Sequence, residues 1–315
     1  MQVTERIYGI PVAAGGHMGP APPNAWLVAV GRAIPLRGSP GLGGSGTKGG
    51  EGILIDAGLG DEETAASCLE YIRGLGVGLA WIVLTHSHTD HAGGADALRR
   101  ATGAPIAMHR QEAPFVGRGP DDFDLPPGAQ ERLRAQREAA ARATPDRLLE
   151  DGDALAVGDL TLEAIHTPGH TLGSLCLYLR QERALFTGDT VLGLGTGVVL
   201  PPPYGDMALY LDSLQRLLTW DAALLLPGHG PLVRQPAQKI AELIEHRRER
   251  EEQLLTALGR GQRTLDQLLR QIYPELTSNL TSMARQQIIS HMEKLRQEGR
   301  VTVEGQGKEA VYFAG

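Results

Sequence analysis

The stretch that most constrains the fold of this chain is THSHTDHAGG, from Thr85 to Gly94, which carries three histidines and an aspartate within six consecutive residues. It follows directly on the apolar run LAWIVLTHS, which is typical of a buried strand. Neutral imidazole nitrogens and carboxylate oxygens are good zinc ligands. A catalytic metal needs three or more protein ligands, so one loop is not sufficient. The fold must therefore bring further ligands to the end of this strand.

Three later segments can supply the missing ligands. His170 lies in TPGHT, Asp189 in FTGDT and His229 in LLPGHGP. Each follows a strand-like run and is flanked by glycine, which lets the backbone turn sharply and place a ligand. Within the first loop, alternate residues can point the same way and share one metal, while the next two turn toward a second position. The whole set is sufficient for two metal ions and comprises His86, His88, Asp90, His91, His170, Asp189 and His229.

Short apolar runs alternate with helical patterns in two similar halves of residues 1–235, which predicts an α/β fold with sheets covered by helices. Strands are expected at AWLVAVG, GILIDAG, LAWIVLTHS and AALLLPGHG, among others. The Gly-rich segment at about 38–50 cannot build a core and predicts a loop or a hairpin tip. MALYLDSLQRLLTW shows helical spacing at Leu211, Leu214 and Leu218.

From residue 236 the pattern changes to three helices followed by two alternating strands around a Gly-containing turn, which describes a winged helix. The third helix places Ile288, Met292 and Leu295 on one face. The sequence thus predicts two domains, at residues 1–235 and 236–315. The charged run EHRRERE alternates in sign and is interpreted as a solvated helix face.

Charge and composition narrow the classes of partner. The net charge is −7, which argues against coating nucleic acid or anionic membrane through bulk charge. Residues 236–315 carry 12 basic and 11 acidic groups, so strong duplex DNA binding is not expected despite the winged helix. Cys68, expected on a surface helix, and Cys176, expected in a strand, form no disulfide framework. We expect no signal peptide, no membrane span and a cytoplasmic location.

The motif HxHxDH, followed by the histidine of TPGHT, the aspartate of GDT and the histidine of PGHG, resembles the metallo-β-lactamase superfamily. The resemblance implies an αββα sandwich with the metals at one edge. Longer stretches, including GDTVLGLGTGVVLPPPYGDMALYLDSL and HMEKLRQEGRV, are similar to the β-lactamase-like protein 2 family, which adds a C-terminal winged helix. The implied ligand sets are His86, His88 and His170 for one ion, and Asp90, His91 and His229 for the other, with Asp189 as the bridge.

The resemblance implies a hydrolase with two Zn²⁺ per chain, with Mn²⁺ or Fe as alternatives, and a metal-bound hydroxide as nucleophile. Asp189 would bridge the ions, and Asp90 would also orient the attacking water. Two substrate classes follow from the family: single-stranded RNA cut by an endoribonuclease, placed slightly ahead, and a thioester or ester, as in glyoxalase II and fungal thioesterases. Two other hypotheses are an iron-dependent oxidoreductase like persulfide dioxygenases and a DNA-binding regulator with a degenerate enzyme domain.

Several further polar residues can be assigned either to the site or to the surrounding structure. His166 is either a hydrogen-bonding partner near the metals or, as favoured, a satisfied polar residue in a strand. Thr171 and Ser174 either bind substrate or, as favoured, cap a local turn. Tyr204 and Tyr210 line the cleft or pack in the core. His17 and His109 are assigned to surface or packing roles. The sequence leaves the oligomeric state and the role of the winged helix open.

Overall fold

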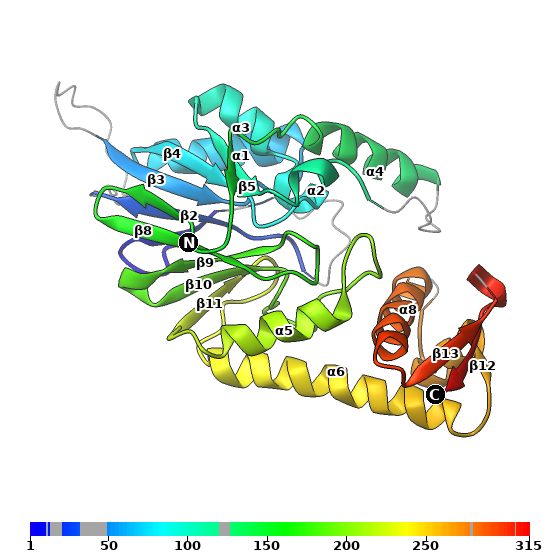
Figure 1. Cartoon of the computed structure of the whole chain (residues 1–315). Coiled ribbons are helices and arrows are strands. Elements are labelled where there is room, and N and C mark those ends of the chain that lie inside the picture. Colours follow the sequence, from blue (N-terminus) through cyan, green and yellow to red (C-terminus); the bar gives the residue numbers. More distant parts are fainter. Residues whose placement is uncertain (11, 13–20, 32–48, 120–126, 278–279, 306) are drawn as a thin grey trace.

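Two β-sheets stacked face to face occupy the centre of the first 235 residues in the computed structural model (Figure 1). The structure describes residues 1–10, 12, 21–31, 49–119, 127–277, 280–305 and 307–315. His17 and most of the Gly-rich segment at about 38–50 lie outside these residues, so the expectations for them stay predictions.

The first sheet has the strand order β1-β2-β3-β4-β5-β6, antiparallel from β1 to β3 and parallel from β3 onward. Its strands are β1 (Ile7–Ile10), β2 (Ala25–Val30), β3 (Gly50–Ile55), β4 (Val77–Val83), β5 (Ile106–His109) and β6 (Arg147–Leu149). The second sheet has the order β11-β10-β9-β8-β7, with only β10 and β11 parallel. Its strands are β7 (Ala154–Val157), β8 (Leu160–His166), β9 (Leu175–Leu179), β10 (Ala184–Gly188) and β11 (Leu224–Pro227).

The central strands are buried on both faces, and the two-residue period of a strand divides their side chains between two cores. In β9, Leu175, Leu177 and Leu179 enter the core between the sheets. Cys176 and Tyr178 point the other way, into the core beneath the second sheet. This is why these segments read as continuous apolar runs rather than as alternating ones.

Helices cover the outer face of each sheet, so the four layers form the αββα sandwich that the sequence predicted (Figure 1). The helices of this part are α1 (Glu62–Gly74), α2 (Thr89–Ala92), α3 (Ala95–Thr102), α4 (Pro127–Ala140) and α5 (Met207–Leu217). Side chains of α1 and α3 pack on the first sheet, and side chains of α5 pack on the second.

The C-terminal part is a winged helix, as expected. It contains α6 (Pro236–Leu258), α7 (Leu265–Ile272), α8 (Thr281–Gln297), β12 (Arg263–Thr264), β13 (Val301–Glu304) and β14 (Val311–Ala314). Ile288, Met292 and Leu295 form one buried face of α8, as predicted. The short strand β12, which pairs with β14, was not predicted, because two residues carry no periodic signal.

The long helix α6 joins the two parts (Figure 1). Ile240 and Ile244, in its first half, belong to the core beneath the second sheet, whereas Leu254 and Leu258 belong to the core of the winged helix. Because one rigid helix contributes to both cores, it ties the winged helix to the sandwich. The boundary between residues 235 and 236 stays a prediction.

Cys68 lies on α1, a helix of the outer layer as expected, with its side chain facing the core. Two expectations about exposure were wrong. Leu214 is buried and Leu211 packs against the same core, but Leu218 is the C-terminal capping residue of α5 and is exposed, whereas Tyr210 and Leu217 are buried instead. The EHRRERE run is not a solvated face throughout, since Arg247 and Glu251 are buried. Arg247 is covered by a loop of the sandwich and Glu251 by α8, and the local sequence does not indicate either contact.

Among the helices of the described residues, none combines the length and the apolar character that crossing a bilayer would require.

Phe186 tests the packing between the sheets, because its ring is fully buried and its centroid lies 6.5 Å from that of Trp26. Phe186→Ala is expected to lower the free energy of unfolding by about 3–5 kcal/mol, through lost transfer energy and a residual cavity. Urea denaturation followed by tryptophan fluorescence measures this change. Leu209→Ala, at an exposed position of α5, is the control and should change it by about 0.5 kcal/mol or less. Equal effects of the two substitutions would contradict the assigned core.

Candidate metal centre

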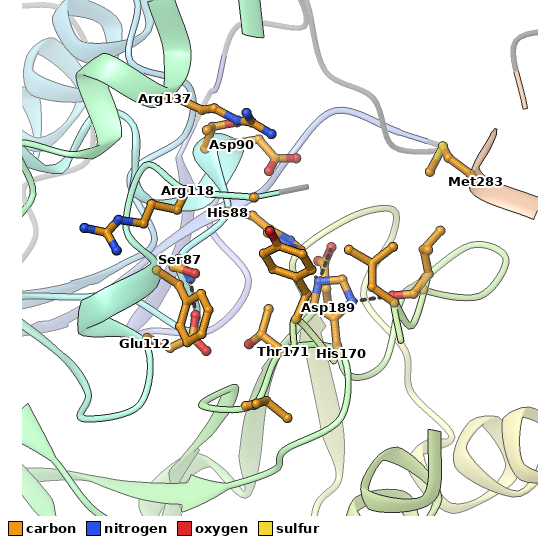
Figure 2. Close-up of a pocket in the computed structure, with 18 of the residues that line it drawn as sticks. Ser87, His88, Asp90, Glu112, Arg118, Arg137, His170, Thr171, Asp189 and Met283 are labelled. Atoms are coloured by element: carbon orange, nitrogen blue, oxygen red, sulfur yellow. Dashed lines mark hydrogen bonds and ion pairs between the residues drawn. The ribbon is translucent and has the colours of Figure 1, made fainter. Parts of the chain in front are cut away.

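All seven predicted ligand side chains meet at one edge of the sandwich. His86, His88, Asp90 and His91 lie on the loop and the short helix α2 that follow β4. The other three follow the carboxyl ends of β8, β10 and β11 and are His170, Asp189 and His229. Figure 2 shows His88, Asp90, His170 and Asp189 around one pocket, so segments about 100 residues apart converge here.

One group of possible ligand atoms comes from three histidines. The Nδ1 atom of His88 lies 3.0 Å from Nε2 of His86 and 3.0 Å from Nε2 of His170. These ring nitrogens belong to a set whose members all lie within 4.8 Å of one another. Three imidazole nitrogens that face a common point are a suitable arrangement for a divalent ion.

A second group lies beside the first. The Nε2 atom of His229 is 3.3 Å from Oδ2 of Asp90 and 3.3 Å from Nε2 of His91. These three side chains also form a set of potential ligands within 4.8 Å. The two groups are the ones that the family resemblance implied.

Asp189 lies between the two groups. Its Oδ1 atom is 3.4 Å from Nε2 of His91, and its Oδ2 atom is 3.7 Å from Nε2 of His170 and 3.5 Å from Nε2 of His229. Oδ1 is buried and has no hydrogen-bond partner among the described residues. A buried carboxylate oxygen without a partner is costly, and a cation at this point would satisfy it. The donor set therefore fits divalent metal ions.

Burial and neighbouring carboxylates shift the pKa values of the histidines in opposite directions. Burial lowers the pKa of His170 to about 4 and that of His86 well below its usual value, so both rings are neutral at pH 7 and present a lone pair. Burial also opposes protonation of His91, but the carboxylates of Asp56, Asp189 and Asp90 outweigh it and raise the pKa of that ring to about 10. A bound cation competes with this proton for the same carboxylates.

Backbone carbonyls orient two of the rings. Nδ1 of His170 donates to the carbonyl oxygen of Val198 at 2.6 Å, and Nδ1 of His229 donates to that of Ala21 at 2.7 Å. A carbonyl accepts only, so Nδ1 of each ring must carry a proton, and in the neutral ring Nε2 is the nitrogen left without one. Nε2 then presents its lone pair to the cluster, as a metal ligand requires.

Asp56 orients the other side of the cluster, and sequence analysis did not identify it. It follows β3 with a φ of 60°, accepts from the backbone N–H of Thr85 at 2.8 Å and lies 2.8 Å from Nδ1 of His91. The Thr85 hydroxyl donates to Asp56, so its oxygen can accept from Nδ1 of His86 at 3.0 Å. An acidic residue at the end of the strand beside β4 was the available signal.

Glu112 was also missed. Its buried carboxylate accepts from the backbone N–H of Ser87 at 2.7 Å and from that of Gly173 at 2.8 Å. It therefore joins the loop of the first histidines to the loop that carries His170. Nothing in the local sequence indicates this role, because both partners are backbone groups distant along the chain.

Two glycines are required at the centre for reasons of space. A Cβ at Gly228 would lie 2.4 Å from Oδ1 of Asp189 and 2.7 Å from Cε1 of His91. Gly169 has a φ of 141°, and a Cβ there would lie 2.3 Å from the Cα of Tyr210. The glycines beside the ligands thus permit close approach of backbone to site as well as sharp turns.

The remaining polar residues make local contacts, and Thr171 also lines the pocket. His166 Nε2 lies 2.9 Å from the carbonyl oxygen of Leu172, and its ring stacks on that of His109 at a centroid distance of 4.0 Å. The backbone N–H of Thr171 donates to Ser174 Oγ at 3.1 Å, which is a local turn contact. Tyr210 is fully buried, whereas Tyr204 lines the pocket.

The metal centre opens into a pocket with a largely apolar wall (Figure 2). Arg118 and Arg137 are the cationic residues among those that line it, and Met283 reaches it from α8. The other apolar side chains of the wall are Phe115, Leu133, Leu172, Leu192, Val198, Leu200 and Tyr204. The site can thus accommodate an apolar group next to the two groups of possible metal ligands.

Comparison with known proteins agrees with this geometry. Residues 47–229 match the metallo-beta-lactamase superfamily, and residues 264–309 match the beta-lactamase associated winged helix domain. A metallo-beta-lactamase family protein from Thermus thermophilus has a crystal structure that covers 98% of both chains, with a TM-score of 0.73 and 27% sequence identity.

Two relatives bear on the finer resemblance. The beta-lactamase-like protein 2 homolog of Caenorhabditis elegans is 32% identical over 217 residues, which cover 67% of this chain and 62% of that protein. The match therefore spans less than two thirds of that relative. The atrochrysone carboxyl ACP thioesterase of Passalora fulva is 29% identical over 273 residues, which cover 83% of this chain and 72% of that protein. The resemblances inferred from the sequence motifs are confirmed.

Asp189 is expected to be necessary for metal binding, because its two carboxylate oxygens lie near histidines of both groups. Asp189→Ala should bind fewer than one metal ion per chain instead of two, with unchanged near-UV circular dichroism, since Oδ1 of Asp189 makes no hydrogen bond with the residues that the structure describes. Elemental analysis of the purified protein measures metal content. Asp212→Ala, an exposed aspartate of α5, is the matched control. Two ions per chain in Asp189→Ala would be inconsistent with a bridging role.

Asp56 is expected to act on metal affinity through His91. Asp56→Asn removes the charge that holds the protonated Nδ1 of that ring, and it should weaken binding of the ion held by His91 by about 10–100-fold. Chelator competition at pH 7 measures the change. Asp61→Asn, which keeps an N-cap side chain on α1, serves as control. An affinity equal to that of the wild type would show that the Asp56–His91 contact does not tune the site.

Proposed function

The chain belongs to the metallo-beta-lactamase superfamily and has the fold and ligand set of a metal-dependent hydrolase, and we propose that it holds two zinc ions and hydrolyses acyl thioesters or related esters. His86, His88 and His170 would hold one ion. The second would be held by Asp90, His91 and His229, with Asp189 shared between the two.

The observation that carries the substrate class is the apolar wall beside the ligands. An acyl chain has no polar groups to satisfy, and burial of its methylenes against Leu172, Leu200 and Met283 would stabilise the complex by about 0.8 kcal/mol for each CH₂. The scissile carbonyl would then lie at the polar end of the pocket, near Asp189. The similarity to the atrochrysone carboxyl ACP thioesterase of Passalora fulva supports the same class.

Divalent ions held by these residues would lower the pKa of a bound water molecule and would polarise the carbonyl group of the substrate. The chain itself orients the groups. The Asp90 carboxylate, 3.3 Å from Nε2 of His229, would accept a hydrogen bond from the attacking water and so orient it. Neither cysteine can replace this chemistry, because burial raises the pKa of Cys68 to about 12 and that of Cys176 to about 11.

Single-stranded RNA is the second candidate, although the sequence alone placed it slightly ahead. Phe115 and Tyr204 form an edge-to-face pair at the pocket, with centroids 6.3 Å apart, and could stack on a base. A phosphodiester backbone, however, is bound by several lysine or arginine side chains in a row. Among the described residues that line the pocket, the arginines are Arg118 and Arg137, which are too few for such a row. The acyl substrate therefore has the stronger support.

The two other hypotheses have less support. A single-iron oxygenase does not need the second ligand group, yet Asp90, His91 and His229 lie together. A DNA-binding regulator would use α8, but Gln287, Ser290 and His291 of that helix are buried. The identity of the metal, weak duplex DNA binding and a cytoplasmic location stay predictions.

A substrate panel tests the proposal. For thioesters of increasing acyl length, kcat/KM should rise by about fourfold for each added CH₂ until the pocket is filled, since about 0.8 kcal/mol corresponds to that factor. Single-stranded RNA, a lactone and a β-lactam should be turned over more slowly.

Met283→Glu places a charge in the apolar wall and should raise KM for a long acyl chain more than for an acetyl ester. Ser282→Glu adds the same charge at the neighbouring position, which is not among the pocket-lining residues, and is the control. Faster turnover of RNA than of every thioester would reject the acyl substrate in favour of the second candidate.

A further inference from the structure

The segment Gly197–Leu200 lies between the metal centre and the C-terminal helices. On one side, the carbonyl oxygen of Val198 accepts from Nδ1 of His170 at 2.6 Å. On the other side, side chains of α6 and α8 bind the backbone groups immediately before and after Val198. The winged helix thus contacts a ligand of the proposed metal centre through one residue of intervening backbone.

Arg247 of α6 makes the first of these contacts. Its Nη2 donates to the carbonyl oxygen of Gly197 at 2.5 Å, although only 2% of the residue is exposed. Its guanidinium lies over the ring of Tyr210, 5.3 Å from the centroid, and the Tyr210 hydroxyl donates to the carbonyl oxygen of Thr190, next to Asp189. A buried guanidinium is costly unless it is paired or hydrogen-bonded, so this contact is a specific arrangement rather than chance packing.

Gln287 of α8 makes the second contact. Its Oε1 accepts from the backbone N–H of Val199 at 3.1 Å, and the residue is buried. Arg247 and Gln287 therefore hold the peptide groups on both sides of Val198. A side chain at Gly197 is not tolerated either, since its Cβ would lie 2.7 Å from the carbonyl oxygen of Asp189. The position of the Val198 carbonyl depends on all of these contacts.

We propose that Arg247 and Gln287 are positioning residues of the metal centre, through which the C-terminal helices hold the Val198 carbonyl and thereby orient His170. The inference rests on the proposed metal centre but not on any particular substrate. It assigns a role to the winged helix that needs no nucleic acid: this domain sets the affinity of the ion held by His86, His88 and His170. The ion held by Asp90, His91 and His229 has no such connection among these contacts.

Stepwise metal binding to the full-length protein tests the proposal. Arg247→Met and Gln287→Met keep side-chain length and remove the polar contacts. In chelator competition with zinc, each substitution should weaken the binding of one ion by about 10–100-fold and leave the affinity for the other within about threefold of wild type. His170→Ala identifies which ion is affected. With cobalt in place of zinc, the visible spectrum of that ion should shift in the same variants.

Two further variants separate positioning from packing. Arg248→Met changes an exposed arginine on the same helix and should bind both ions like wild type. Gln287→Glu keeps an oxygen that accepts from Val199 and should restore most of the affinity that Gln287→Met loses. If Arg247→Met does not fold, the two Gln287 variants decide the question alone.

The outcomes are distinct. Wild-type affinity for both ions in the folded Arg247→Met and Gln287→Met variants would overturn the proposal and leave the metal centre intact. Equal weakening of both ions, or no rescue by Gln287→Glu, would also overturn it, because the effect would then be general destabilisation. Failure of the wild-type protein to bind metal would instead reject the proposed function.

Discussion

The concentration of ionisable groups at one sheet edge is the constraint on which the site depends. Five histidines and two aspartates are held within a few ångströms, and most of them are buried. In low dielectric, uncompensated charge of this kind is costly, and the free energy of the fold falls when cations or protons balance it. The pKa shifts of two histidines reflect this balance. Burial dominates at His170 and lowers its pKa, whereas three carboxylates dominate at His91 and raise its pKa. The same arrangement that is unfavourable alone is suited to two divalent ions.

A second layer of contacts holds this arrangement in place. Asp56 fixes the side of the cluster that contains His91, and Glu112 joins two ligand loops through their backbone N–H groups. Val198 and Ala21 contribute carbonyl oxygens that determine which nitrogen of a ring carries the proton. These partners come from separate parts of the chain, so the site is formed only when both sheets and the loops between them are folded.

The winged helix is part of this second layer. Since α6 contributes to the sandwich core and to the C-terminal core, the position of α8 against the sandwich is determined by packing rather than by a flexible linker. Met283 then reaches the pocket wall, and Gln287 reaches the segment behind His170. The winged helix has the order of elements of a nucleic-acid-binding domain. Here it contributes one side chain to the pocket and one hydrogen bond to the segment beside His170. This is consistent with its near-neutral charge of 12 basic and 11 acidic groups.

Local sequence determined the ligand types and the element types. Histidines in HxHxDH, a histidine in TPGHT and a histidine in PGHG lie beside glycines that backbone geometry requires, and continuous apolar runs predicted buried strands. These signals are local, so they can be recognised in the sequence alone. Only the tertiary structure decided what lies behind the ligands and which charged residues are buried. Asp56, Glu112, Arg247 and Gln287 act on groups far away in the chain, often on backbone atoms that have no sequence signature. Leu218, Arg247 and Glu251 were misjudged for the same reason: burial depends on the neighbouring element that covers a face, and the packing of the whole fold determines that neighbour.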